Sequence, residues 1–221
     1  ELRPFRRQMQ MIFQDPFASL NPRMTVGETI AEPMVVHGIT DKTGASEKSV
    51  EILKKVGLTS DYASRYPHEL SGGQRQRIGI ARALAHEPNL IIADEAVSAL
   101  DVSIQAQVVN LMMELQEEFG LSYLFISHDM AVIERVCHRV AVMYLGEIVE
   151  LGTRGQVFEN PKHPYTKKLM KAVPIADPKL RKKELNLMTD EIPSLVKPIG
   201  YEPEKIDLIK VEEGHFIKPY N

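Results

Sequence analysis

The chain has 221 residues, of which 43% are hydrophobic and 26% are charged, and its formal net charge is −3. This composition fits a globular protein with a sizeable core, and the acidic balance argues against bulk electrostatic binding to nucleic acid. No apolar run approaches the length needed to span a bilayer, so we expect any membrane association to come through a partner. The single cysteine, Cys137, cannot form an internal disulfide and suits a reducing compartment.

The first part of the chain is predicted to be a short strand followed by helices. Met9–Phe13 reads as the strand. The pattern then becomes helical from Thr25, which has Glu28 three residues later, the spacing of a capping box. An amphipathic helix is expected over Ser46–Val56, with Gly57 ending it.

From about residue 71 onward, helices and strands alternate, which is typical of a parallel α/β sheet. The expected helices begin at Ser71, Ser103, Asp129 and Pro164, and they end near Pro88, Phe119, Cys137 and Ala172. The expected strands are Leu90–Ala93 and Ser122–Ser127, followed by a hairpin of Val140–Tyr144 and Glu147–Leu151 around Gly146. We expect the compact core to end near Asn160, with a looser extension after it.

The motifs with chemical potential are concentrated between residues 70 and 101. Ser71-Gly72-Gly73-Gln74 precedes a predicted helix, where free backbone N–H groups can bind a phosphate. An apolar strand then ends in Asp94-Glu95, and two such carboxylates can hold a magnesium ion and activate a water. Taken alone, the serine could be an ordinary N-cap and the carboxylates could cap the next turn.

The order and spacing of these motifs resemble the ATPase subunits of ABC transporters, in which a signature loop, a Walker B strand and a D-loop follow one another. The resemblance implies a P-loop NTPase-type α/β fold: a parallel sheet, an inserted helical subdomain and a C-terminal extension. ATP and Mg²⁺ are the implied ligands. Asp94 is then expected to coordinate magnesium through water, and Glu95 to act as the general base on the attacking water.

The resemblance extends to two residues that would mean little alone. Gln14 matches the Q-loop glutamine, which contacts the metal or water and senses the membrane partner. His128 matches the switch histidine, which contacts the γ-phosphate and orients the water. The resemblance implies that the remaining site residues bind a nucleotide held by an opposing ATPase domain. These residues are Ser71, Gly72, Gly73 and Gln74 of the signature loop, and Ser98 and Asp101 of the D-loop.

No G-x-x-x-x-G-K-[ST] phosphate loop occurs in the 221 residues. In the family this loop lies upstream of the segment that contains Gln14, so we expect the chain to be an N-terminally truncated piece of a longer polypeptide. Without the loop, the isolated chain should hydrolyse little ATP. The missing core strands should also expose apolar sheet edge and favour self-association or rearranged strand pairing.

Four segments are expected from these motifs. They are the end of the first core segment with the Q-loop (1–24), a helical subdomain with the signature (25–87), the Walker B and switch-histidine part of the core (88–160), and a C-terminal extension (161–221). Asn160–Leu169 resembles the C-terminal segment of oligopeptide and dipeptide importer ATPases. Further segments resemble the glutathione-importing branch of that group, namely Glu32–Gly38, Ala93–Val102, Val173–Pro178, Asp190–Ser194 and Gly214–Phe216.

The resemblance also implies partners and a location. We expect a second ABC ATPase domain, transmembrane permease subunits that contact the region of the Q-loop and, indirectly, a periplasmic or extracellular substrate-binding protein. The parent protein would hydrolyse ATP to drive uptake of glutathione or short peptides, as a peripheral protein on the cytoplasmic face of the inner membrane. No nucleic-acid partner is expected.

Three other readings compete with this one. The chain could belong to a different oligopeptide, dipeptide or nickel importer, or it could be a non-catalytic fragment that acts only as a binding module. An ABC-type ATPase of DNA repair or chromosome maintenance would carry long coiled coils before the signature. Only about 56 residues separate Gln14 from Ser71, so the last reading is disfavoured.

Overall fold

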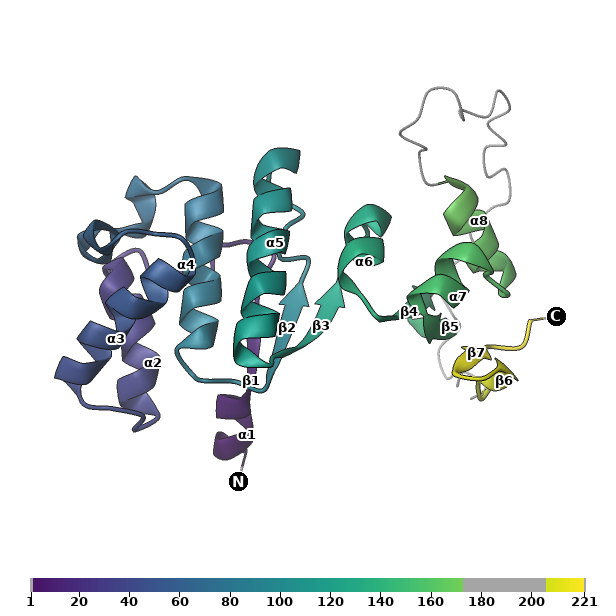
Figure 1. Cartoon of the computed structure of the whole chain (residues 1–221), viewed down its shortest axis with the longest axis horizontal. Coiled ribbons are helices and arrows are strands. Elements are labelled where there is room, and N and C mark those ends of the chain that lie inside the picture. The colour runs from purple at the N-terminus through teal and green to yellow at the C-terminus, as the bar shows by residue number, and fades with distance from the viewer. Residues whose placement is uncertain (1, 173–205, 221) are drawn as a thin grey trace, which may run out of the picture. The chain divides into compact units, whose positions relative to one another are not determined.

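The computed structural model describes residues 2–172 and 206–220 (Figure 1). The chain divides into two compact units, Glu1–Val132 and Ile133–Asn221. The four segments predicted from the sequence are a finer division than these units, and their borders stay a prediction. Among the described residues, every helix is too short or too polar to cross a membrane.

The first unit contains a parallel sheet in the order β1-β2-β3, formed by Met9–Ile12, Leu90–Asp94 and Ser122–Ile126. Its register aligns Met11 with Ile92 and Ile92 with Leu124. Because side chains alternate along each strand, one face of the sheet carries the buried residues Ile12, Ile91 and Ala93. The other face leaves Met9, Met11, Leu124 and Ile126 exposed.

Helices make up the rest of this unit: α1 Arg3–Gln8, α2 Val26–Val36, α3 Lys42–Lys55, the 3₁₀ helices η1 Ser60–Ser64 and η2 Pro67–Glu69, α4 Gly72–Leu84, α5 Val102–Phe119, and α6 Met130–Val136, which crosses the unit border. Helices α2, α3 and η1 pack on one another, and both α2 and α3 contact α4. Helix α4 also contacts β1 and α5, so it joins the helical subdomain to the sheet (Figure 1).

Local sequence signals account for several helix ends. The predicted capping box is confirmed, because the Thr25 N–H donates to Glu28 at 2.8 Å and the Glu28 N–H donates to the Thr25 hydroxyl at 3.3 Å. Helix α3 begins at Lys42 rather than Ser46, since the Asp41 carboxylate accepts the Gly44 N–H at 2.8 Å and caps an earlier turn.

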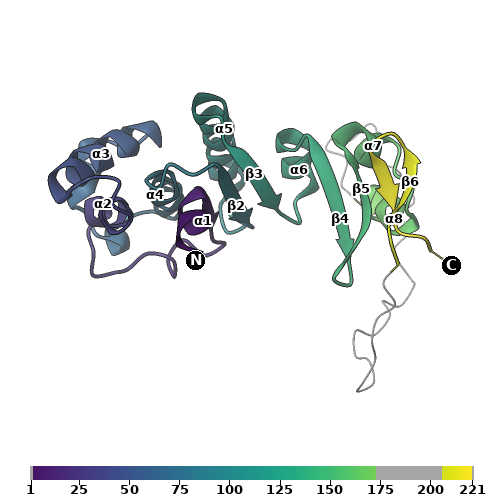
Figure 2. The same ribbon diagram turned by 90° about the horizontal axis from the view of Figure 1, so that it is seen from below.

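The second unit is an antiparallel sheet in the order β4-β5-β7-β6 with two helices. Its elements are β4 Arg139–Tyr144, β5 Glu147–Thr153, α7 Arg154–Glu159, α8 Pro164–Ala172, β6 Ile209–Glu212 and β7 His215–Ile217. The predicted hairpin and the predicted helix after residue 163 are both present. The yellow strands β6 and β7 complete the sheet (Figure 2).

The two C-terminal strands correct the expectation that the compact core ends near Asn160 and that the extension adds only one helix. Strand β7 pairs with β5 through Glu150 opposite Ile217 and Leu151 opposite Phe216. Strands this short carry too few residues for a period-2 pattern, and their pairing partner lies far away in the sequence. Two segments used for the finer resemblance, Val173–Pro178 and Asp190–Ser194, lie outside the described residues.

Candidate active site

The candidate site is built at the carboxyl ends of the three parallel strands. Gln14 lies two residues after β1, Glu95 directly after β2, and His128 two residues after β3. In open α/β sheets, ligands bind at this end of the strands. The topology therefore brings together three residues that are far apart in the sequence.

The Glu95 carboxylate is the centre of this group. Its Oε2 accepts a hydrogen bond from Gln14 Nε2 at 2.7 Å, and its Oε1 lies 3.3 Å from His128 Nδ1. A carboxylate can only accept, so His128 carries its proton on Nδ1 in this arrangement. The Glu95 side chain is 30% exposed and that of His128 is 71% exposed, so the pair is open to solvent and to a ligand.

The backbone of Glu95 has an uncommon conformation, with φ of 46° in the left-handed region. Its N–H donates to the Ile126 carbonyl at 2.9 Å, which fixes the residue against the end of β3. Its carbonyl accepts from the Ser98 hydroxyl at 2.9 Å and from the Ser98 N–H at 3.1 Å. Gln14 Nε2 also lies 3.4 Å from the Ser98 hydroxyl, so Ser98 belongs to the same group.

Asp94 is the last residue of β2 and is half-buried beside Glu95. Among residues 2–172 and 206–220, no three His, Cys, Asp or Glu side chains gather closely enough to hold a metal. One carboxylate is a fitting ligand for magnesium when substrate phosphates supply further oxygens. Because Gln14 uses its nitrogen towards Glu95, its carbonyl oxygen is the atom that could join Asp94 on such an ion.

The signature residues start helix α4. Ser71 is the N-cap: its hydroxyl accepts the Gln74 N–H at 3.3 Å, and its N–H donates to Gln74 Oε1 at 2.9 Å. Gly72 and Gly73 lie within the first helical turn rather than in a flexible lead-in. Ser71 and Gly72 are exposed, so the start of this helix faces solvent.

Gly73 allows α4 to approach helix α5 closely, whereas Gly72 leaves room for an ordinary contact with the D-loop. A Cβ atom on Gly73 would lie 2.5 Å from Ile104 Cγ2, and one on Gly72 would lie 3.7 Å from Leu100 Cδ2. Asp101 is the N-cap of α5 but makes no side-chain capping bond, and it is exposed. The structure thus places Leu100 and Ile104, on either side of Asp101 in the sequence, beside the glycines of the signature.

Three further residues support the site and were not singled out from the sequence. Asp129 accepts from Gln105 Nε2 at 2.9 Å and from the Ala131 N–H at 2.9 Å, which holds the turn after His128. On α4, the Arg75 guanidinium lies over the Phe17 ring at 4.9 Å, and Arg82 donates to the Ser19 carbonyl. An Asp before a helix is a recognisable N-cap signal. The two arginine contacts have no such local signal.

Known proteins match both halves of the chain. Residues 1–98 match the ABC transporter family, and residues 149–200 match the family described as oligopeptide/dipeptide transporter, C-terminal region. The chain is 60% identical over 216 residues to the glutathione import ATP-binding protein GsiA of Pectobacterium atrosepticum. It is 56% identical over 217 residues to GsiA of Escherichia coli. Each alignment covers 98% of this chain and 35% of the relative.

This chain is homologous to the ATP-binding proteins of ABC transporters. It spans about a third of the length of the curated relatives that it matches. The resemblance drawn from the signature, Walker B and D-loop motifs is thereby confirmed.

Solved ABC structures share the fold. One is cbiO1 from Clostridium perfringens, part of the ABC transporter complex cbiONQ, with a TM-score of 0.63 and 28% identity over 71% of this chain and 61% of that chain. The other is the ATP-binding cassette MJ0796, a dimer in a post-hydrolysis state bound to ADP and Pi. Its TM-score is 0.60 and its identity 31%, over 69% of this chain and 66% of that chain. The predicted ABC ATPase fold is confirmed, whereas the individual residue roles stay predictions.

Proposed function

We propose that the chain supplies the Q-loop, signature, Walker B and switch-histidine portion of an ATP-hydrolysing domain that drives import of glutathione or short peptides. The observation that supports this most strongly is the contact of both Glu95 oxygens with Gln14 and His128 at the ends of three parallel strands. The cargo class is supported by the glutathione import relatives and by the match of residues 149–200 to the oligopeptide/dipeptide transporter region.

In the proposed reaction, Glu95 accepts a proton from the water that attacks the γ-phosphorus. Each carboxylate oxygen accepts one contact in this structure and has a second lone pair, so the attacking water can bind Glu95 beside Gln14 and His128. His128 is mostly exposed and would turn towards the γ-phosphate. Magnesium, when bound, would neutralise phosphate charge, and Asp94 with the Gln14 carbonyl oxygen would hold it.

The signature group is proposed to act on the nucleotide of an opposing ATPase domain. Its exposed helix start presents the backbone N–H groups of Gly72 and Gly73, and the positive end of the α4 dipole favours a phosphate. Asp101 and Ser98 would cross to the same opposing domain. Such a shared site makes closure of the two domains depend on ATP, and this is how hydrolysis would be coupled to movement of permease subunits.

The proposed partners are therefore a second ATPase domain, the permease subunits near the Q-loop and, indirectly, a substrate-binding protein. The proposed location is the cytoplasmic face of the inner membrane. Two alternatives keep the same fold: an ATPase of another oligopeptide, dipeptide or nickel importer, and a non-catalytic binding module. The module reading is favoured for the isolated chain because its sequence contains no phosphate loop.

The test is ATP hydrolysis by this chain alone and by the chain joined to an upstream segment that carries a phosphate loop. We expect turnover only in the longer form. Glu95→Gln in that form should lower the rate about 100- to 10,000-fold, because the general base is lost while the shape of the side chain is kept.

The matched control is Glu117→Gln, which removes a charge from an exposed position on α5 and should leave the rate unchanged. Equal turnover by the chain alone would show that the nucleotide binds and reacts without the phosphate loop, at a site other than the one proposed. Full activity of the Glu95→Gln variant would remove Glu95 from the chemistry. Nucleotide-dependent binding to a partner without turnover in either form would favour the binding module.

A further inference from the structure

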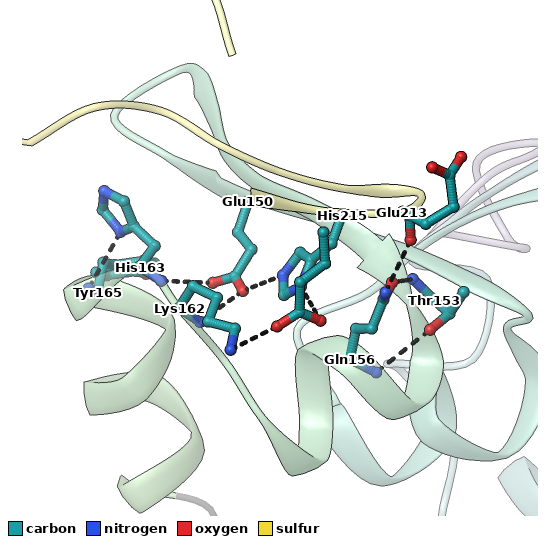
Figure 3. A network of polar contacts seen from close by, with 9 residues as sticks. Glu150, Thr153, Gln156, Lys162, His163, Tyr165, Glu213 and His215 are labelled. Atoms are coloured by element: carbon teal, nitrogen blue, oxygen red, sulfur yellow. Dashed lines mark hydrogen bonds and ion pairs between the residues drawn. The ribbon is translucent and has the colours of Figure 1, made fainter. Parts of the chain in front are cut away.

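The second unit contains a buried carboxylate that none of the proposed ATPase chemistry uses. Glu150 on β5 is 0% exposed, and three N–H groups surround its side chain (Figure 3). Its Oε1 accepts the Lys162 N–H at 2.8 Å and lies 2.7 Å from His215 Nε2, while its Oε2 accepts the His163 N–H at 3.0 Å. Burial alone would raise the pKa of Glu150, but the nearby Thr166 hydroxyl together with these three donors outweighs it and lowers the pKa below its usual value. Glu150 is therefore ionised at neutral pH.

His215 comes from β7 and is also 0% exposed. Gly152, two residues after Glu150 on the same face of β5, leaves space for its ring: a Cβ there would lie 3.1 Å from His215 Cδ2. Since Glu150 can only accept, His215 donates through Nε2. Strand β5 thus provides both the space, at Gly152, and the charged partner, Glu150, for the His215 side chain of the C-terminal hairpin, β6–β7.

Charged groups on the neighbouring elements complete the surroundings. His215 Nδ1 lies 3.9 Å from Glu212 Oε2 and has no hydrogen-bond partner among the described residues. Glu212 in turn pairs with Lys162 Nζ at 2.7 Å. Two carboxylates therefore flank the His215 ring, the buried Glu150 and the exposed Glu212, and the Lys162 ammonium pairs with the second of them. Lys218, which follows β7, pairs with Glu147 on β5.

Further contacts attach the hairpin to the rest of the unit, among them the buried side chain of Ile217. Strand β7 pairs with β5 at only two positions, extended by the Lys218 N–H donating to the Val149 carbonyl at 2.8 Å. Every residue of β6 is exposed. At the turn, Gln156 Nε2 donates to the Glu213 carbonyl at 3.0 Å. In the Glu150–His215 pair, by contrast, both side chains are fully buried, one from β5 and one from β7.

We propose that Glu150 and His215 form a latch that holds the C-terminal hairpin on β5, and that the hairpin detaches as a unit when the latch is broken. Detachment would uncover the edge of β5 and leave its N–H and C=O groups free to pair with another strand. The latch also reaches α8, because Glu150 accepts the two N–H groups that precede it. Residues 149–200 match the oligopeptide/dipeptide transporter region. The latch therefore joins Glu150, near the start of that region, to His215, which follows the end of the region.

The test is hydrogen exchange of the Lys218 amide in the 221-residue chain, with Glu150→Gln and His215→Phe as the variants. The phenylalanine keeps a ring in the space at Gly152 but removes the donor. We expect exchange at Lys218 to become about 100-fold faster in each variant, because either change leaves a buried group unpaired. In the double variant, the Lys218 amide should exchange no faster than in the more affected single variant, since both substitutions remove the same interaction.

Glu213→Gln is the matched control, because the Glu213 side chain is exposed and pairs with Lys210 inside the hairpin, so the change should leave exchange unchanged. Amides of β4 report on the rest of the unit. Fast exchange at Lys218 with unchanged β4 supports a latch. Unchanged exchange at Lys218, or an equal acceleration in β4, would overturn it, since the pair would then be dispensable or simply part of a single cooperative core.

Discussion

Glu95 combines a strained backbone with a precise setting for its side chain. A non-glycine residue in the left-handed region costs about 1–3 kcal/mol and persists only where its surroundings determine it. Here the Ile126 carbonyl and the Ser98 hydroxyl fix the peptide groups on either side of the residue. The carboxylate is thereby held between Gln14 and His128. Strain at this position is consistent with its proposed role, because a less constrained turn would not aim the carboxylate at both partners.

Gly73 sets the distance between the signature helix and α5, and this leads to a test of stability. In Gly73→Ala the new methyl group would lie 2.5 Å from Ile104 Cγ2, so either the Ile104 side chain or one of the two helices must shift. We expect the free energy of unfolding to fall by about 1–3 kcal/mol, as in other overpacked sites. Urea denaturation followed by circular dichroism measures this change.

The control for this substitution lies on the same helix. Gly79 is buried in α4, but a Cβ there would meet nothing within 4 Å. Gly79→Ala should therefore raise the free energy of unfolding by about 0.5–1 kcal/mol, since alanine restricts the unfolded chain without a clash. Equal effects of the two substitutions would show that helix propensity, rather than the contact with Ile104, decides the result.

At the scale of elements, the parts that could be predicted are those with a local cause. The strand before Asp94, the capping box at Thr25 and the helix from Pro164 each follow from residues within one or two turns of the chain. The proximity of Glu95 to Gln14 and His128 could also be predicted, because each residue follows a predicted strand. Contacts made between distant elements could not be predicted, as with Arg82 on the Ser19 carbonyl and β7 on β5.

The start of helix α8 should make the second unit sensitive to acid. His163 precedes the helix, and its Nδ1 accepts the Tyr165 N–H at 3.2 Å, which requires an unprotonated nitrogen. Burial lowers the pKa of His163, Glu150 opposes this and Lys218 adds to it. Because the folded-state pKa is below the unfolded value of about 6.5, stability is complete above that pH and declines as the pH falls towards the folded-state pKa.

Thermal unfolding of the second unit between pH 7.5 and 5 measures this dependence. His163→Gln should flatten the decline, since glutamine cannot take up a proton. The exposed His68 is the control, and His68→Gln should leave the slope unchanged. Glu150, whose pKa is also lowered, contributes stability that is lost only as the pH falls below about 4.5, so its effect lies outside this window. A slope that is identical in the wild type and in His163→Gln would exclude His163 as its source.

At the scale of the whole molecule, the open face of the first unit's sheet sets how the chain behaves in solution. Met9, Met11, Leu124 and Ile126 lie on this face, and Leu124 is 53% exposed. Contiguous apolar surface of this kind favours association, and β3 adds an unpaired edge. The predicted self-association of the chain therefore has a specific surface that can carry it.

Leu124→Lys tests this surface, because a charge on the edge strand β3 opposes burial of the face in a second copy. We expect the wild-type chain to sediment as dimers or larger species at micromolar concentration, and the variant to move towards the monomer. Val102→Lys is the matched control: Val102 is 84% exposed and belongs to helix α5 rather than to a strand of the sheet, and the change adds the same charge. A monomeric wild type would refute the prediction. Equal dissociation by both variants would trace the association to net charge rather than to this face.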